Sequence, residues 1–158
     1  MAALGLVASP SMSGAPAYVA AFEALKPAVL ARLLEVRASL DHAFARQSPE
    51  EAHELFEGVL VGLRTLLVTG DHGLHRGFVQ SFIALRQADG LAPDHALRVL
   101  VAIGDVSVQV ARRDRPDDTT LVLAVTSAIR VTARLVNEVI ADDLAKRSAQ
   151  RRQTEAWR

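Results

Sequence analysis

The sequence predicts an all-α fold, a single domain of about five helices with a long C-terminal helix. Three observations indicate this class. Apolar residues recur at the three- and four-residue spacing of a helix in five successive segments of the chain. Glycines, prolines and capping residues separate these segments, and neither strand-like alternation nor an internal repeat is found. The 158 residues suffice for one domain with one sizeable core.

The composition narrows the class of protein further. Half of the residues are hydrophobic but only 4% are aromatic, so aliphatic side chains must fill the core. Eighteen acidic and 18 basic residues balance, so bulk charge predicts neither a nucleic acid nor an anionic membrane as partner. The absence of cysteine excludes disulfides, thiolate catalysis and thiolate metal sites.

The N-terminal residues 1–16 are small and uncharged, and they lack the basic n-region of a signal peptide. We expect a flexible leader there. No apolar run approaches the ~20 residues that a membrane span requires. The sequence therefore favours a soluble cytoplasmic protein.

The first two helical segments are defined by their proline and capping residues. The first covers about 17–46 and should kink at Pro27 or restart with that residue in its first turn. The second begins at Ser48, which forms a capping box with Glu51, and Gly70 ends it. These signals predict two core helices in the first half of the chain.

The third segment, about 71–88, should turn Phe78, Phe82 and Leu85 inward. The fourth, about 93–113, and the fifth, from about 117 onward, are apolar over roughly two-thirds of their circumference. Both are rich in β-branched residues, which makes strands the competing interpretation. Their length and their lack of turn residues favour helices.

The wide apolar arcs of the last two segments must be covered on more than one side. A partner subunit is a natural cover, because a large apolar patch rarely stays exposed on a soluble monomer. The alternative is that the first three segments wrap both helices completely. We expect a homodimer whose interface includes the following aliphatic residues: Val99, Ile103, Val106, Val110, Val122, Val125, Ile129, Val136 and Val139.

The apolar pattern stops after Leu144, which divides a helical domain over 17–145 from a polar helical tail or linker over 146–158. Five basic residues against one acidic residue could indicate a nucleic-acid tail. Trp157 is the only aromatic residue there, and no base-reading pattern accompanies it. A solvated tail or linker is the favoured interpretation.

The stretch TGDHGLHRG at 69–77 places Asp71, His72 and His75 close together. Two histidines three residues apart on a helix could share a cation, but zinc needs a third ligand, for example His42, His53 or His95. The usual H-E-x-x-H spacing is absent. We therefore interpret the stretch as a joint, in which Gly70 ends one helix and Asp71 caps the next. His72 and His75 should then lie on the surface of its first turn.

Two other histidines are weaker candidates, one for a phospho-acceptor and one for a haem ligand. His53 in HELF resembles the phospho-acceptor stretch of sensor histidine kinases, but the residues usual downstream do not follow. His95 could be a haem ligand, although the first turn of a helix is an awkward place for one. Phosphate loops, nucleophile elbows and inward acid pairs are not found. We expect no enzyme, and we assign no catalytic, cofactor-binding or metal-binding residue.

The run FEGVLVGLRTLLVTGD, a following helix, and RQADGLAPDHALRVLVAIGDVSVQVARR together resemble the N-terminal sensor domains of RsbR-type stressosome co-antagonists. The resemblance covers about residues 18–145 and rests on aliphatic pattern and turns. It implies a non-haem, globin-like fold, a homodimer and no catalytic residues. In that family the last helix continues into a STAS domain. This chain ends at Arg158 without one, so it is either an isolated sensor piece or acts alone.

These observations favour a non-enzymatic signalling sensor or interaction domain. A small apolar ligand or a partner protein would bias the packing of the last two helices, and the C-terminal helix would relay the change. Two alternatives stay open. One is a haem- or metal-binding globin-like sensor, and the other is a histidine phosphotransfer or dimerisation module that uses His53.

Overall fold

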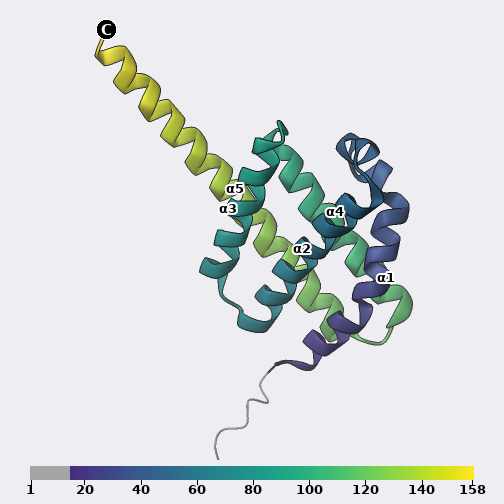
Figure 1. Ribbon diagram of the computed structural model, residues 1–158. Coiled ribbons are helices and arrows are strands. Elements are labelled where there is room, and N and C mark those ends of the chain that lie inside the picture. The colour runs from purple at the N-terminus through teal and green to yellow at the C-terminus, as the bar shows by residue number, and fades with distance from the viewer. Residues whose placement is uncertain (1–14) are drawn as a thin grey trace, which may run out of the picture.

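The computed structural model describes residues 15–158, and every regular element in that range is helical. Five α-helices and one short 3₁₀ helix form a bundle, and the last helix projects from it (Figure 1). The elements are α1 (Ala17–Leu40), η1 (His42–Arg46), α2 (Pro49–Thr69), α3 (His72–Ala88), α4 (Pro93–Asp114) and α5 (Thr119–Ala156). The predicted all-α class, the number of helices and the long C-terminal helix are confirmed.

The predicted start and end of α2 and the predicted start of α3 are confirmed in detail. The Ser48 side chain accepts a hydrogen bond from the Glu51 N–H at 3.2 Å, and Glu51 accepts one from the Ser48 N–H at 3.0 Å. Gly70 ends α2 with a φ of 62°, a left-handed conformation that glycine adopts without steric cost. Asp71 then caps α3 by accepting from the Leu74 N–H at 3.0 Å.

The first predicted segment differs from the structure. Helix α1 runs through Pro27 and ends at Leu40, and a separate 3₁₀ turn follows. The physical reason is Asp41, whose backbone is extended and whose side chain accepts a hydrogen bond from the Ala43 N–H at 3.0 Å. That local bond competes with continuation of the helix and starts the new turn.

Helix α4 lies at the centre of the bundle, where it contacts α1, α2, α3 and α5. Its closest neighbour is α5, because Gly104 presents bare backbone to the side chain of Ile129. The four other α-helices cover the wide apolar arc of α4 on several sides. The core therefore forms within one chain.

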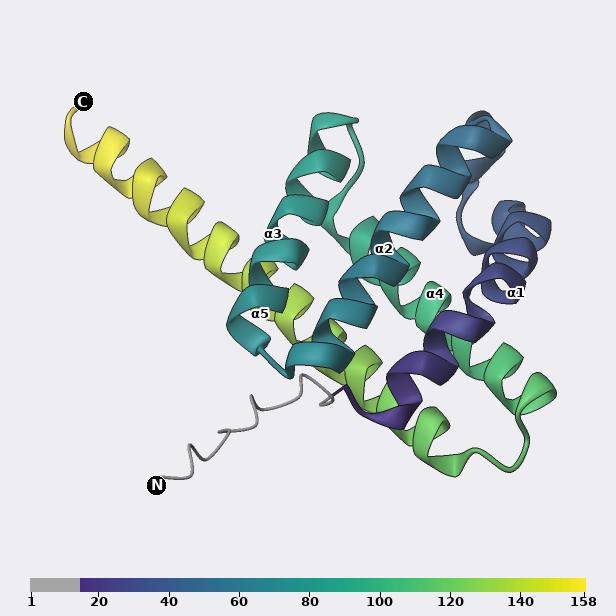
Figure 2. The same cartoon turned by 60° about the horizontal axis from the view of Figure 1, so that its bottom comes forward.

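Helix α5 has 38 residues and serves two purposes along its length. Its first half packs against α4 and α3, whereas every residue from Leu144 to Arg158 is exposed. Figures 1 and 2 both show this second half extending away from the bundle.

By length and composition, α5 contains an 18-residue window that is apolar enough to cross a membrane, which was not expected from the sequence. A third of that window, 33%, is buried within the bundle, and core helices of other proteins meet the same criterion. The helix therefore provides only weak evidence for a membrane span.

Candidate functional site

The predicted dimer-interface residues divide into two groups in the structure. Six of them lie in the core of the single chain, so the prediction that they form a surface between subunits is corrected: Val99, Ile103, Val106, Val110, Val125 and Val136. The reason is that α1, α2 and α3 wrap α4 and the inner face of α5. The remaining three, Val122, Ile129 and Val139, are partly buried and keep some accessible surface on α5.

The outer face of α5 retains an apolar strip. Val122 and Ile129 are half-buried at the edge of this face, where Ile129 also packs against Gly104 of α4, and the side chain of Leu123 beside Val122 is 69% exposed. Thr126 and Arg130 continue this face. We call these five residues the α5 strip.

The joint between α2 and α3 is confirmed as a turn and a cap, but the prediction that both of its histidines lie on the surface was wrong for His75. His72 is exposed as expected, whereas His75 is only 2% exposed and stacks on Phe78, with ring centroids 5.4 Å apart. The Nε2 of His75 lies 2.8 Å from the Thr132 hydroxyl on α5. Because that hydroxyl donates to the Ala128 carbonyl, His75 must donate its Nε2–H to Thr132. Burial and the nearby His72 lower the pKa of His75 below 6.5.

Further polar contacts join α3 to α5 beside this histidine. Arg76 donates to Glu138 at 2.9 Å and to Asp142 at 2.6 Å. His72 Nδ1 lies 3.0 Å from the Arg134 guanidinium. Within residues 15–158 the structure places no group of three or more histidine or carboxylate side chains that could hold a metal ion. The stretch at 69–77 therefore connects two helices to α5.

His53 lies on α2 with a partly exposed side chain, and its Nδ1 is 3.8 Å from a carboxylate oxygen of Glu57 one turn later. The structure thus places this histidine at the helix surface, as expected. Its only described ionic neighbour is on the same helix.

His95 is buried and belongs to a polar cluster at the start of α4. Its Nδ1 lies 3.0 Å from Asp41 Oδ2, which also lies 3.2 Å from Arg98 Nη2. Burial by itself would raise the pKa of Asp41, but the Ala43 N–H, His95 and Arg98 outweigh it and lower the pKa. The cluster fastens the α1–η1 junction to α4.

The Nε2 atom of His95 is buried and has no hydrogen-bond partner among the described residues. A histidine whose other nitrogen bonds a carboxylate is a usual arrangement for a metal ligand. The ring of Phe44 lies 6.0 Å away, however, and His95 does not line the cavity beside Asp41. Because His95 Nε2 has almost no accessible surface, a haem iron could reach it only if the side chains around it moved.

A cavity of about 510 Å³ lies between α2 and α3, and the sequence interpretation did not find it. Its apolar wall consists of Leu55, Gly58, Val59, Phe78, Phe82 and Leu85. Leu85, which was predicted to point inward, is 63% exposed at its rim. The one signal in the sequence was Gly58, a glycine in the middle of a helix with no turn to explain it.

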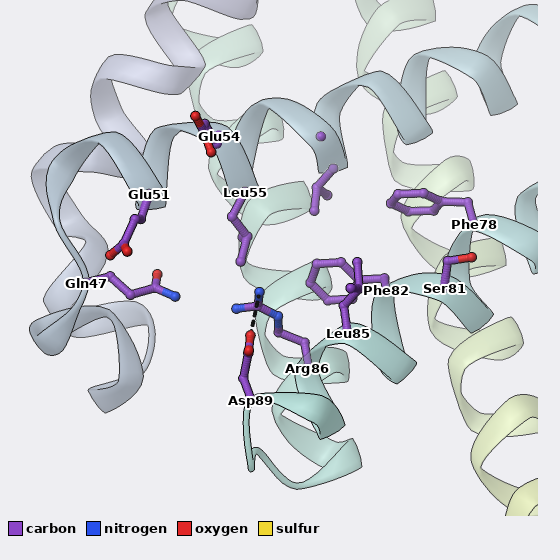
Figure 3. Close-up of a pocket in the computed structure, with 12 residues that line it drawn as sticks. Gln47, Glu51, Glu54, Leu55, Phe78, Ser81, Phe82, Leu85, Arg86 and Asp89 are labelled. Carbon is purple, nitrogen blue, oxygen red and sulfur yellow. Dashed lines mark ion pairs between the residues drawn. The ribbon is translucent and has the colours of Figure 1, made fainter.

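The other end of the cavity is polar, as Figure 3 shows. The Arg86 guanidinium donates from Nη2 to Asp89 at 3.1 Å and lies 5.9 Å from the centre of the Phe82 ring. Its side chain is only 14% exposed. Glu51 and Glu54 also lie on this side of the cavity.

Comparison with known proteins gives no relative: no protein-family model, no curated protein and no solved structure matches the chain.

Proposed function

We propose that this chain is a non-enzymatic signalling sensor or interaction domain of the kind that begins RsbR-type stressosome co-antagonists. In this proposal it has their globin-like, non-haem fold, lies in the cytoplasm and acts as a homodimer. It relays a signal through α5. The single observation that supports the proposal best is the division of α5 into a packed part up to about residue 143 and a fully exposed end from Leu144 onward. A continuous helix that joins a core to solvent is suited to transmit a change in packing.

The polar contacts between α3 and α5 supply the connection between a site and this helix. Helix α3 presents Phe78 and Phe82 to the cavity, and its first turn joins α5 through His75, which stacks on Phe78, and through Arg76. A change at the cavity that shifts α3 would therefore act on α5 directly. Such a shift requires different affinities of the signal for two arrangements of the helices.

The α5 strip is the surface that supports a homodimer. It carries the most exposed leucine of the bundle helices and lies on the same helix that leaves the core. Pairing two copies of this strip about a twofold axis would place the two exposed halves of α5 near each other. Of the residues that the sequence predicted at a dimer interface, Val122 and Ile129 belong to this strip.

Sedimentation velocity over a wide range of protein concentrations tests the proposal. We expect a dimer that Leu123→Glu converts to a monomer, since a charge in an apolar interface is costly. Leu85→Glu is the matched control, because Leu85 is similarly exposed but lies on α3. A wild-type chain that stays monomeric at high concentration would overturn the proposal, as would dimers that Leu123→Glu leaves intact.

A further inference from the structure

We infer that the cavity between α2 and α3 binds a small uncharged molecule with an apolar body and an amide head group. This inference goes beyond the proposed function because it assigns a site and a ligand class. It rests on the proposed function in one respect only, which is that ligand binding would be the signal that α3 transmits to α5.

The volume and the lining of the cavity support a small apolar body. About 510 Å³ lies within the ~300–1,000 Å³ usual for small-molecule sites. The wall is aliphatic and aromatic, and Leu85 at the rim is an exposed apolar side chain that a ligand would cover.

Gly58 gives the cavity a stretch of bare backbone. A Cβ on this residue would meet nothing within 4 Å, so packing within the chain does not require glycine here. By contrast, a Cβ on Gly62 would come within 2.7 Å of the Phe78 ring. Glycine inside a helix costs about 1 kcal/mol relative to alanine. A ligand lying against the backbone at residue 58 would explain why a side chain is missing there.

The head group follows from the unpaired polar atoms at the polar end of the cavity. Arg86 Nε and Nη1 are buried without an acceptor among the described residues, and Gln47 Oε1 is buried without a donor. Figure 3 shows the Gln47 side chain and the Arg86 guanidinium pointing toward one another. Buried groups of this kind normally have partners. An amide that entered between them would accept from Arg86 with its carbonyl. It would donate its N–H to Gln47 Oε1 once the Gln47 amide rotates, because in Figure 3 that oxygen is turned away from Arg86.

The charges around the cavity favour an uncharged ligand. Asp89 already pairs with Arg86, and Glu51 and Glu54 add two further carboxylates to the lining. A carboxylate ligand would face these acids, while an ammonium would face the buried guanidinium. An amide meets neither repulsion.

The test is an NMR titration of the full-length chain with octanamide, and with octanoate and octylamine as charged analogues of equal chain length. We expect saturable binding of octanamide, with shifts at Gly58, Leu85 and the Nε of Arg86, and weaker binding of both analogues. Gly58→Leu should fill the cavity and weaken binding at least tenfold without lowering Tm. Gly77→Leu is the control, because Gly77 is also an exposed helical glycine with open space around it but lies outside the lining.

Arg86→Met keeps an apolar stem and removes the donors, so it should weaken octanamide binding about tenfold or more. The inference is overturned if octanamide does not saturate, if Gly58→Leu binds it as wild type does, or if either charged analogue binds more tightly. Binding by a strictly monomeric chain would leave this site standing and overturn the proposed function. A chain that forms the dimer but does not bind octanamide would overturn this site and leave the proposed function standing.

Discussion

Gly104 on α4 lies directly against Ile129 on α5, so that a Cβ on the glycine would overlap the isoleucine side chain. The two central helices therefore approach each other at a point where only glycine fits. This contact sets the position of α5, and hence the direction in which its exposed half leaves the bundle.

Gly104→Ala should destabilise the fold by about 1–3 kcal/mol, because overpacking outweighs the gain in helix propensity. Gly58→Ala, also a glycine within a helix but with open space around it, should instead stabilise by up to about 1 kcal/mol. Urea unfolding of both variants measures the difference. Equal effects of the two substitutions would show that α4 and α5 are less closely packed than described.

Stability should decrease as pH falls below 6.5, in part because His75 is buried. Its pKa in the folded chain is lower than 6.5, so the unfolded chain binds a proton first. The contribution is complete above pH 6.5 and is lost as pH falls toward the lower, folded pKa. Denaturation curves between pH 7.5 and 5 should show a smaller slope for His75→Gln than for wild type. His72→Gln removes only the smaller of the two causes that lower the His75 pKa, so it should reduce the slope less than His75→Gln does. A slope unchanged in His75→Gln would contradict the assignment.

Asp41 should contribute more to stability than its neighbour Asp94. Asp41 is buried against His95 and caps η1, so Asp41→Ala should cost about 1–3 kcal/mol. Asp94 forms an exposed pair with Arg98, and Asp94→Ala should change stability little. Because the pKa of Asp41 is held below 3.8, its contribution is present above that pH and is lost as pH falls through the folded pKa. Chemical denaturation at neutral pH compares the two variants. Equal losses of unfolding free energy would show that the contacts of Asp41 with His95 and Ala43 do not stabilise the fold.

Arg76→Ala should loosen α5 where it leaves the bundle, because Arg76 bonds both Glu138 and Asp142. Exposed ion pairs contribute little to global stability, so Tm should change only slightly. Hydrogen exchange should nevertheless increase in α5 around residues 138–146 and stay unchanged in α1. High salt should have the same effect on the wild-type chain. Equal exchange in both proteins would show that these bonds do not hold α5.

Local signals in the sequence were sufficient for much of the fold. The capping box at Ser48 and the left-handed Gly70 depend on neighbouring residues alone, so their consequences could be predicted. The width of an apolar arc shows that the helix is covered on several sides. It does not show whether other helices of the same chain or a second subunit cover it. For that reason Val99 and Ile103 were assigned to a subunit interface although they pack within the chain.

The candidate sites depended more on tertiary structure. His75 is buried because α5 passes over the first turn of α3, and nothing in the local sequence states which helix lies there. The cavity depends on the separation of α2 and α3. Only Gly58 marked it, and a helical glycine by itself does not show whether a neighbouring helix or a ligand requires it.

If α5 relays a signal as proposed, its exposed end beyond Leu144 would swing about the edge of the bundle as a rigid rod. At 1.5 Å per residue, the helix beyond Leu144 projects on the order of 20 Å, so a tilt of about 10° would move its tip by roughly 3.5 Å. A displacement inside the bundle too small to break the core would thus become a movement large enough to separate two surfaces in contact. Under the proposed function, the length of this exposed end would therefore set how far a change in packing displaces its tip.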